Sequence, residues 1–267
     1  MAHESSVIQI DDTPHSAASS ADGRLVFVTH FRTGALSVLD TVHNTVTKTL
    51  QVQCEPGLYG VAAHPDGSAY VADNSADFVM RVDPVTGEIG PDAGINVRPY
   101  GLALNPAGSR LFAVCPLDHR IEVLDAGIKN ILRIRYNDFG VGLAVSPDGG
   151  ALYVTNHFAG TVSVLDISAV ESAIQAGQSQ CDAPTVADIS VAAAPYGVAA
   201  SPDGSRLYVA HFGSQHVISV IDAHSRAVVD MIHASHGMVR GIAAPDNRRI
   251  YVTNYFSGSV SVINVSR

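Results

Sequence analysis

The sequence predicts an all-β fold, a six-bladed β-propeller with four antiparallel strands in each blade. Three observations lead to this prediction. A pattern of turns and apolar segments recurs six times along the chain, with a period of about 42 residues. Each copy contains four short β-branched or alternating segments separated by Gly, Pro, Asp and Asn, which is the pattern of antiparallel strands joined by tight turns. Repeats of this length with four strands each are typical of propeller blades.

Two positions align the six copies. The first is the residue before the first glycine of the repeat, or before its substitute, and we call these residues the inner set: His15, Tyr59, Tyr100, Val141, Tyr196 and Arg240. The second is the last residue of the second strand, and we call these residues the outer set: His30, Asp73, Cys115, Asn156, His211 and Asn254. Successive members of both sets are 41 to 44 residues apart, except for 55 residues between the fourth and fifth members. The agreement of the two sets supports one alignment for the whole repeat.

The start of the chain supplies the strand that the last repeat lacks. The sixth copy ends after its third strand, at Asn264. Ile8-Gln9-Ile10 stands the same distance before Pro14 as Ile189-Ser190-Val191 stands before Pro195. We therefore expect residues near 7–10 to complete the sixth blade and close the ring, which removes exposed strand edges. Closure predicts that residues 1–267 form one complete propeller domain.

Aspartates recur at the turns of nearly every copy. One series lies in the turn between the first and second strands and another at the end of the third strand: Asp22, Asp66, Asp148, Asp203 and Asp246, and Asp40, Asp83, Asp125, Asp166 and Asp222. An Asp side chain bonds readily to the backbone of its own turn, and a following glycine accepts positive φ. Because these aspartates repeat, we interpret them as structural.

The fourth copy carries an insertion around residues 168–184, which explains its longer interval. Residues 168–175 are rich in Ala, Glu, Ile and Gln and predict a short helix before a return through Gly177. The alignment places the insertion between the third and fourth strands of the blade. A role for it in dimerisation stays open, and we expect a monomer or a weak homodimer.

The charge and composition of the chain limit the classes of partner that it is expected to bind. The formal net charge is -9 with only 16 basic residues and no basic run, which argues against nucleic acid and acidic membranes. Small molecules or proteins are the expected partners. No apolar run reaches membrane length and no secretory signal precedes the repeats, so we expect a soluble, cytoplasmic protein. The three cysteines imply no disulfide framework, which fits a reducing compartment.

Three stretches of the chain resemble YVTN-type β-propeller repeats: YVTNHFAGTVSVLD, YVTNYFSGSVSVIN and PYGVAASPDGSRLYVA. The resemblance extends over essentially the whole chain and is specific for fold rather than for function. Propellers of this kind include surface-layer proteins, lactonase-like enzymes and, more distantly, streptogramin lyases of the virginiamycin B type. Many of them have seven blades, so their functional residues cannot be carried over to these six repeats by position.

Blade geometry places both aligned sets at one mouth of the central tunnel. The innermost strand of a blade runs from one face to the other and the next three alternate in direction. The connections between blades therefore share a face with the turns between second and third strands, and the aspartate turns lie on the opposite face. At this mouth the copies stop matching one another, so it is where we expect function.

The outer set departs from the Asn of the repeat pattern at His30, Asp73, Cys115 and His211. These residue types bind divalent metals or move protons near neutral pH. We expect a site in which His15, His30, Asp73 and His211 act as acid, base or ligand, and in which other residues contact an anionic substrate or enolate. The expected substrate contacts are Tyr59, Tyr100, Tyr196, Arg240, His157 and Cys115, and neighbouring loops add Glu55, Asp138 and His236.

Three interpretations of this site stay open. His15, His30 and His211 could hold a divalent metal ion that acts as a Lewis acid. Without metal, a His base with an Arg or Tyr electrophile could drive elimination or ring opening. In the third interpretation, His simply replaces Asn in a turn and keeps its hydrogen-bonding role. No cofactor other than a possible divalent metal is indicated. Nucleophilic catalysis by Cys115 has less support, because Pro116 and Leu117 indicate a remodelled loop.

The function that these residues favour is small-molecule binding at the tunnel mouth, with lyase or lactonase-like (hydrolase) chemistry as the leading expectation. Motifs for phosphate loops, dinucleotide binding and the α/β-hydrolase nucleophile are absent from the sequence. The alternative is a non-catalytic propeller whose loops bind a ligand or a protein partner.

Overall fold

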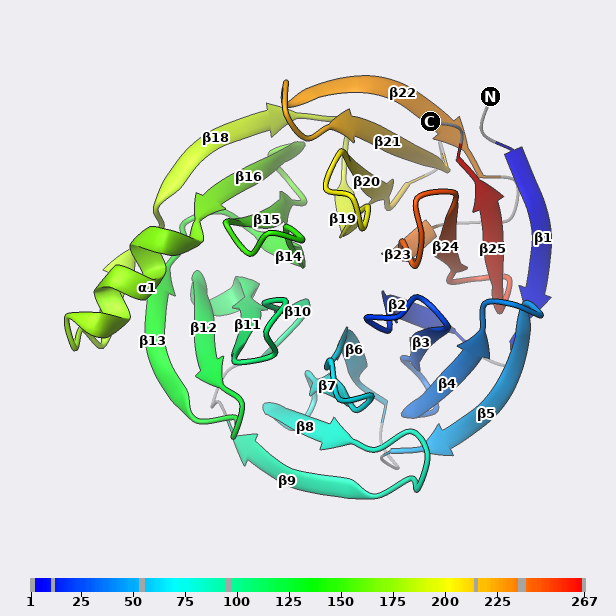
Figure 1. Cartoon of the computed structure of the whole chain (residues 1–267), viewed down its shortest axis with the longest axis horizontal. Coiled ribbons are helices and arrows are strands. Elements are labelled where there is room, and N and C mark those ends of the chain that lie inside the picture. Colours follow the sequence, from blue (N-terminus) through cyan, green and yellow to red (C-terminus); the bar gives the residue numbers. More distant parts are fainter. Residues whose placement is uncertain are drawn as a thin grey trace.

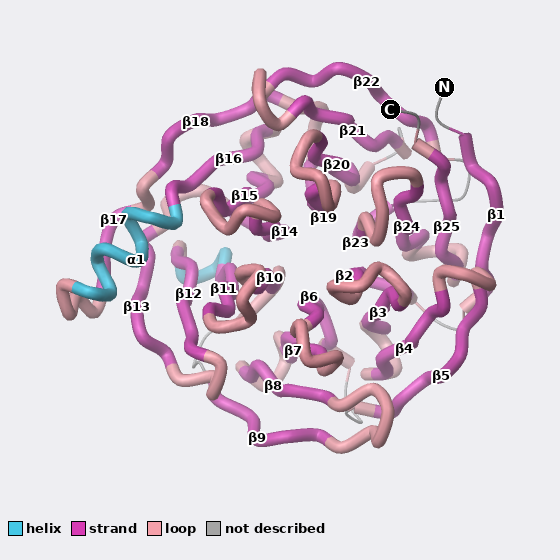
Figure 2. Tube along the Cα trace, viewed as in Figure 1, coloured by secondary structure: helices cyan, strands magenta, loops and turns pink. Residues whose placement is uncertain are grey.

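Six sheets stand around a central axis in the computed structural model of the chain, five with four strands and one with a fifth strand added at its outer edge (Figure 1). The structure describes residues 3–10, 13–52, 56–94, 98–213, 216–234 and 239–265; of residues 91–94 and 239 only the backbone is described. The predicted six-bladed propeller is confirmed, including four antiparallel strands per blade. Figure 2 shows how little of the described chain is helical.

The first three blades follow one another along the chain. Blade 1 consists of β2 (Pro14–Ser19), β3 (Leu25–His30), β4 (Ala35–Asp40) and β5 (Thr45–Gln51). Blade 2 consists of β6 (Leu58–Ala63), β7 (Ala69–Asp73), β8 (Phe78–Val82) and β9 (Ile89–Gly94). Blade 3 consists of β10 (Leu102–Leu104), β11 (Arg110–Cys115), β12 (Arg120–Asp125) and β13 (Asn130–Arg135), with a 3-10 turn at Pro116–Asp118.

The last three blades complete the ring. Blade 4 consists of β14 (Gly140–Val145), β15 (Ala151–Asn156), β16 (Thr161–Asp166) and β18 (Thr185–Ser190). Blade 5 consists of β19 (Pro195–Ala200), β20 (Arg206–His211), β21 (Val217–Asp222) and β22 (Ala227–His233). Blade 6 consists of β23 (Val239–Ala243), β24 (Arg249–Asn254), β25 (Ser259–Asn264) and the N-terminal β1 (His3–Gln9).

The ring is closed as the sequence predicts. β1 pairs antiparallel with β25, from His3 opposite Asn264 to Gln9 opposite Ser259. The Ile10 amide continues the ladder by donating to the Gly258 carbonyl at 2.9 Å. Blade 6 is thereby assembled from both ends of the repeat array.

The insertion in blade 4 contributes to two blades. The helix expected over 168–175 is α1 (Ile167–Gln175), and the Asp166 carboxylate caps it by accepting from the Ser168 amide. A strand that the sequence analysis did not foresee follows, β17 (Gln180–Asp182), and it pairs in parallel with β13. Blade 3 therefore has a fifth strand that comes from the next repeat. Figure 1 shows α1 projecting from the side of the ring.

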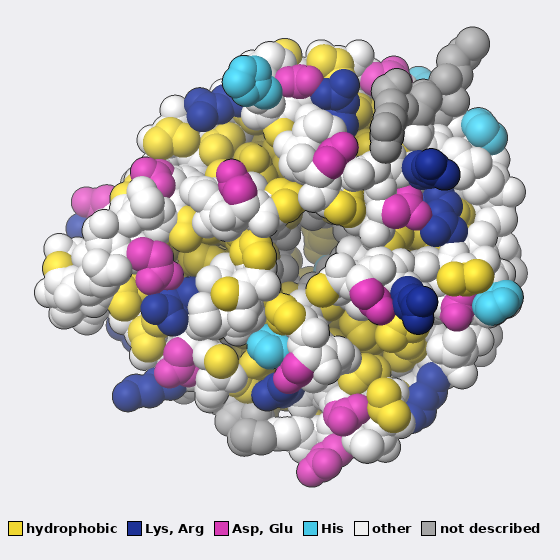
Figure 3. Space-filling view, viewed as in Figure 1, with side chains coloured by type: hydrophobic (Ala, Val, Ile, Leu, Met, Phe, Trp, Pro, Cys, Tyr) yellow, Lys and Arg dark blue, Asp and Glu magenta, His cyan; other side chains and the backbone are white. Residues whose placement is uncertain are grey.

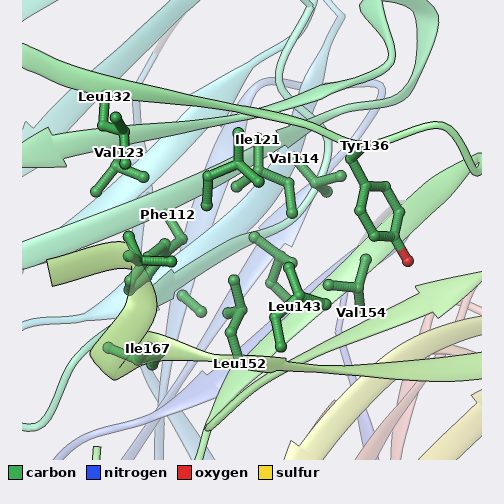
Figure 4. Close-up of a cluster of buried hydrophobic side chains, with 14 residues drawn as sticks. Phe112, Val114, Ile121, Val123, Leu132, Tyr136, Leu143, Leu152, Val154 and Ile167 are labelled. Carbon is green, nitrogen blue, oxygen red and sulfur yellow. The ribbon is translucent and has the colours of Figure 1, made fainter. Parts of the chain in front are cut away.

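The hydrophobic core is divided among the blade interfaces. Six clusters of buried side chains are found among the described residues, and each joins two neighbouring blades, including blades 6 and 1. Figure 4 shows the cluster between blades 3 and 4, where Phe112 and Ile121 pack against Leu143 and Leu152. Because neighbouring blades cover both faces of each sheet, the middle strands consist of nearly continuous apolar residues.

The recurring turn aspartates have the structural role that the sequence indicates. In five of the six turns between first and second strands, the Asp carboxylate accepts from the backbone amide two residues later, as Asp22 does from Arg24 at 3.0 Å and Asp203 from Ser205 at 3.0 Å. The third-strand series forms similar turns, with Asp40 accepting from the amides of Val42 and His43. In the described part of the chain, no helix is long and apolar enough to span a membrane.

Candidate functional site at the tunnel mouth

Backbone irregularities hold the inner set at the tunnel mouth. In blade 1 the register of β2 against β3 shifts between Pro14 and Ala17, so His15 stands at a bulge outside the regular ladder. The same shift occurs at the equivalent place in blades 2, 4, 5 and 6. A bulge bends its strand and changes the direction of a side chain, which makes it a common device beside functional sites. The glycine after most inner-set residues belongs to this bend.

Threonines on the second strands tie three of these bulges to the next blade. The Thr155 hydroxyl accepts from the Gly142 amide at 2.8 Å and donates to the Tyr196 carbonyl at 2.6 Å. Thr29 and Thr253 make the same bridges, and their acceptors are the carbonyls of Tyr59 and His15. A Cβ at Gly142 would overlap the Tyr196 carbonyl oxygen, so glycine permits this close approach. These contacts fix the backbones that carry Tyr59, Tyr196 and His15.

Aromatic side chains form a closed ring of contacts around the mouth, which we call the aromatic annulus. Its members come from all six blades or from the loops between them: His15, Phe31, Tyr59, Tyr100, Phe139, His157, Phe158, Tyr196, Phe212 and Tyr255. Neighbouring ring centroids are separated by distances from 4.4 Å, between His15 and Tyr59, to 6.4 Å, between Tyr100 and Phe139. Tilted and edge-on contacts of this kind add stability beyond the area they bury.

Arg240 completes the annulus with a positive charge. Its guanidinium carbon lies 4.0 Å from the ring centroid of Tyr255, 4.4 Å from that of Phe212 and 5.0 Å from that of Tyr196. Its Nη1 donates to the Tyr196 hydroxyl at 3.4 Å, whereas its Nε makes no hydrogen bond within the described chain. None of the ion pairs found among the described residues includes Arg240. Aromatic rings therefore hold this cation in place while its charge remains uncompensated by a described carboxylate.

His15 is a buried imidazole of the annulus. It is 3% exposed, and its Nε2 lies 3.0 Å from the Tyr196 hydroxyl. Burial lowers the pKa of His15 well below the usual 6.5, and the Arg240 charge lowers it further, while the Tyr59 backbone offsets part of the effect. The imidazole is therefore neutral at pH 7. Its Nδ1 makes no hydrogen bond of good geometry to a described residue.

The phenols and the second imidazole share this environment. Burial raises the pKa of Tyr59 to about 12 and raises the pKa of Tyr196 as well, although Arg240 opposes the shift at both phenols. Both hydroxyls are therefore protonated at pH 7 and able to donate hydrogen bonds. His157 is half-buried between Tyr196 and Phe212, and burial lowers its pKa. The annulus thus combines one cation, two neutral imidazoles and protonated hydroxyls.

Two histidines of the outer set occupy the structural place of asparagine. In blades 4 and 6, the amides of Asn156 and Asn254 donate at 2.8 Å to a serine hydroxyl on the third strand of their own blade. His30 Nε2 lies 2.7 Å from the hydroxyl of Ser37, and His211 Nε2 lies 2.8 Å from that of Ser219, at the same position. Both histidines are buried, and burial lowers the pKa of His211. This geometry supports the interpretation in which His keeps the bonding role of Asn.

Asp73 and Cys115 are also buried within their own blades. The Asp73 carboxylate accepts from the amides of Ser75 at 2.9 Å and Ala76 at 3.0 Å, so it caps the turn that follows β7. The Cys115 side chain is fully buried, and burial together with Glu122 raises the pKa of its thiol. A thiol with a raised pKa is a poor nucleophile. Neither residue belongs to the aromatic annulus.

The metal interpretation of His15, His30 and His211 is not supported by this geometry. His15 lies in the annulus, whereas His30 and His211 bind serines inside blades 1 and 5. Within the described ranges, no three His, Cys, Asp or Glu side chains are grouped so that they could hold a metal ion. Glu55 and His236, which the sequence analysis adds to this mouth, lie outside the described residues.

The site contains aromatic residues that sequence reasoning missed. Phe31, Phe212 and Tyr255 each follow an outer-set residue directly, in the same place as His157. This shared position was the signal that could have identified them. Comparing the copies one residue beyond the outer set would have shown a third aligned position rich in rings. Phe139 precedes β14 and has no counterpart in the repeat.

A cavity of about 220 Å³ lies along the tunnel axis next to the inner set. Its lining residues come from the first strand of each blade and the residues adjoining it, and they include His15, Tyr59, Tyr100, Tyr196 and Arg240. The inner-set side chains that carry polar groups are therefore the ones that a small ligand in the tunnel would meet. The histidines of the outer set, His30 and His211, do not line the cavity.

Comparisons with known proteins support the fold and no narrower relationship. The chain resembles hydrazine synthase from Kuenenia stuttgartiensis, with a TM-score of 0.73 and 18% identity over 97% of each chain. It also resembles the Cps50 (Swd1) β-propeller domain from Myceliophteria thermophila, with a TM-score of 0.75 and 12% identity over 100% of each chain. No protein-family model and no curated protein sequence matches the chain. At these identities the structural likeness shows the propeller fold alone.

Proposed function

We propose that the tunnel mouth binds a small carboxylate or related oxyanion and acts on it as a lyase or lactonase-type enzyme. The observation that carries the proposal is Arg240, a cation caged by three aromatic rings without a described carboxylate partner. Structural arginines elsewhere in the chain pair with acids, as Arg249 does with Asp246 and Arg110 does with Glu171. Because aromatic rings rather than a carboxylate hold the guanidinium group of Arg240, its positive charge is available to a ligand. The planar guanidinium can also form two parallel hydrogen bonds to a carboxylate.

The surrounding groups supply proton transfer. In the tautomer whose Nδ1 carries the proton, His15 Nε2 accepts the proton of the Tyr196 hydroxyl, and the Tyr196 oxygen accepts a proton from the carbon next to the bound carboxylate. The electron pair of that C–H bond forms the new C=C bond as the leaving group departs from the neighbouring carbon. Arg240 stabilises the enolate-like charge, and the Tyr59 and Tyr100 hydroxyls orient it. In a lactone, the same groups would activate water and stabilise the oxyanion.

A binding measurement tests the anion site. The chain has no tryptophan and nine tyrosines, so tyrosine emission reports on the annulus, and salicylate serves as a small absorbing carboxylate probe. We expect Arg240→Gln to weaken salicylate binding by about 10-fold to 100-fold, because a hydrogen bond to a charged group contributes about 1.5 to 3 kcal/mol. The matched control is Arg32→Gln, which removes the same charge from an exposed position on the same face. Equal affinities of the two variants would contradict the proposal.

Turnover is tested separately with β-substituted carboxylates and lactones, followed by the appearance of C=C absorbance or of the ring-opened acid. We expect His15→Gln to lower the rate by about 10²-fold to 10⁴-fold, the usual contribution of a positioned base, with little change in salicylate affinity. His30→Asn should leave the rate unchanged, because His30 bonds to Ser37 away from the cavity.

One observation favours the second candidate, a non-catalytic propeller that docks a protein. Phe158 and Phe256 are 78% and 66% exposed on the loops that surround the annulus. Exposed aromatic side chains are common anchors in protein interfaces. This candidate gains support if Arg240→Gln leaves salicylate binding unchanged while replacement of both phenylalanines by serine abolishes capture of a partner.

A further inference from the structure

The tunnel cavity continues to the face opposite the annulus. A second hollow of about 610 Å³ lies at that face, among the turns that join the first and second strands of the blades. The two hollows share lining residues at the turn ends of the innermost strands, including Ser19, Leu104 and Ala200. Figure 3 shows this face of the molecule, and its centre is hollowed. The two hollows therefore adjoin each other along the tunnel axis.

At its other end the cavity meets the annulus. The lining includes inner-set residues such as His15 and Tyr196 but none of the rings on the neighbouring loops, such as Phe31, Phe212 and Tyr255. His15 and Tyr196 lie 3.0 Å apart through Nε2 and the hydroxyl, and Arg240 spans the space between Tyr196 and Tyr255. The described side chains therefore form a polar floor on the tunnel side of the annulus.

The shaft between the floor and the turns is short and narrow. Ser19 lies four residues after His15 along β2, which corresponds to about 13 Å at the rise of a β-strand. Small side chains dominate the wall, with alanine recurring at the equivalent place in all six innermost strands, at Ala18, Ala62, Ala103, Ala144, Ala199 and Ala243. A cavity of about 220 Å³ admits a small anion of the size of salicylate and excludes a bulky one.

We infer that the ligand enters through the tunnel from the face of the aspartate turns, and that the shaft limits it to small carboxylates or sulfonates. The inference rests on the proposed anion site at Arg240 but concerns its route of access. It gives the turn face a functional role beyond the structural one of its aspartates. Each Asp fixes its turn at the entrance through a backbone amide, and Arg24 and Arg249 offset the charges of Asp22 and Asp246, which line this hollow.

A thiol placed at the floor of the shaft tests the route without knowledge of the natural ligand. Val141 is buried at the floor, so Val141→Cys introduces a reporter there, in a chain whose Cys54 and Cys181 are replaced by serine. The probe is 2-sulfonatoethyl methanethiosulfonate, a small anion, and mass spectrometry follows its reaction. Cys115 stays in the background, and the chain without Val141→Cys measures its contribution.

Variants that narrow only one end of the shaft identify the end through which the probe enters. We expect Ser19→Trp at the turn end to slow labelling by about tenfold or more, and Phe139→Trp in the annulus to leave it within about twofold, because thiol reactivity follows access. Leu104→Trp narrows the same end from another blade and replaces Ser19→Trp if that variant does not fold. Absence of labelling at residue 141, an unchanged rate in the turn-end variants, or slowing by Phe139→Trp would each overturn the inference.

The experiment separates the route from the anion site. Labelling of Val141→Cys depends on the shaft and does not require affinity at Arg240. If labelling shows access from the turn face while salicylate binds Arg240→Gln and the unmodified protein equally, the route stands and the proposed function fails. If salicylate binding depends on Arg240 but only the annulus variant slows labelling, the function stands and the route fails.

Discussion

A residue's chemistry and its position in the repeat point to different roles at this tunnel mouth. His30 and His211 have the side chains of catalysts, yet each bonds to the serine that asparagine bonds in blades 4 and 6. The sequence shows the substitution but not the partner, because the serine lies on another strand. His15 differs in that it stands at a bulge, faces the tunnel cavity and contacts Tyr196. Among the predicted site residues, membership of the inner set separates those that line the cavity from the rest.

Substitution at His30 tests this distinction. We expect His30→Asn to change the free energy of unfolding by less than about 0.5 kcal/mol, because the Asn amide can reach the Ser37 hydroxyl as it does in the neighbouring blades. His30→Ala should cost about 1 to 3 kcal/mol, because it leaves the buried Ser37 hydroxyl with one partner fewer. Urea unfolding of both variants measures the difference. Equal destabilisation by Asn and Ala would show that the imidazole has a role that asparagine cannot replace.

Individual elements follow from the sequence where the repeat is regular. Turn aspartates, apolar middle strands and the helix of the insertion all lie where local patterns place them. β17 could not be foreseen in this way, because three residues of mixed polarity give no strand pattern and their partner, β13, belongs to another blade. The ring of aromatic contacts in the annulus was missed for a related reason, although His15, Tyr59, Tyr100, His157 and Tyr196 were predicted at this mouth. Its contacts join residues from different repeats, and only the closed ring brings them together.

The insertion helix is tied to the propeller through its buried face. Val170 on α1 is fully buried in the cluster between blades 3 and 4, whereas Gln175 at the end of the helix is exposed. We expect Val170→Ala to lower the free energy of unfolding by about 1 to 3 kcal/mol through loss of packed methyl groups. Gln175→Ala, the control on the same helix, should stay within about 0.5 kcal/mol. Urea unfolding compares them, and a neutral Val170→Ala would mean that α1 does not contribute to the blade interface.

The whole molecule depends on the pairing of its first and last strands. Each blade interface is a separate hydrophobic cluster, and the cluster between blades 6 and 1 contains Ile8 and Ile10 from the start of the chain as well as Val260 and Val262 from β25. Because the annulus draws residues from all six blades, the geometry at Arg240 and His15 requires that this last interface be closed. The proposed function at the mouth is therefore coupled to the pairing of β1 with β25.

Removal of residues 1–10 tests that coupling. Loss of Ile8 and Ile10 should cost about 3 to 6 kcal/mol of apolar burial, and the uncovered edge of β25 should promote concentration-dependent association. The affinity of the truncated chain for salicylate should fall together with its stability, although no residue of β1 lines the cavity. Urea unfolding and analytical ultracentrifugation measure the first two effects. A peptide of residues 3–10 added in trans should restore stability and salicylate binding together by pairing with β25, whereas a truncated chain that keeps full affinity would show that the annulus forms without a closed ring.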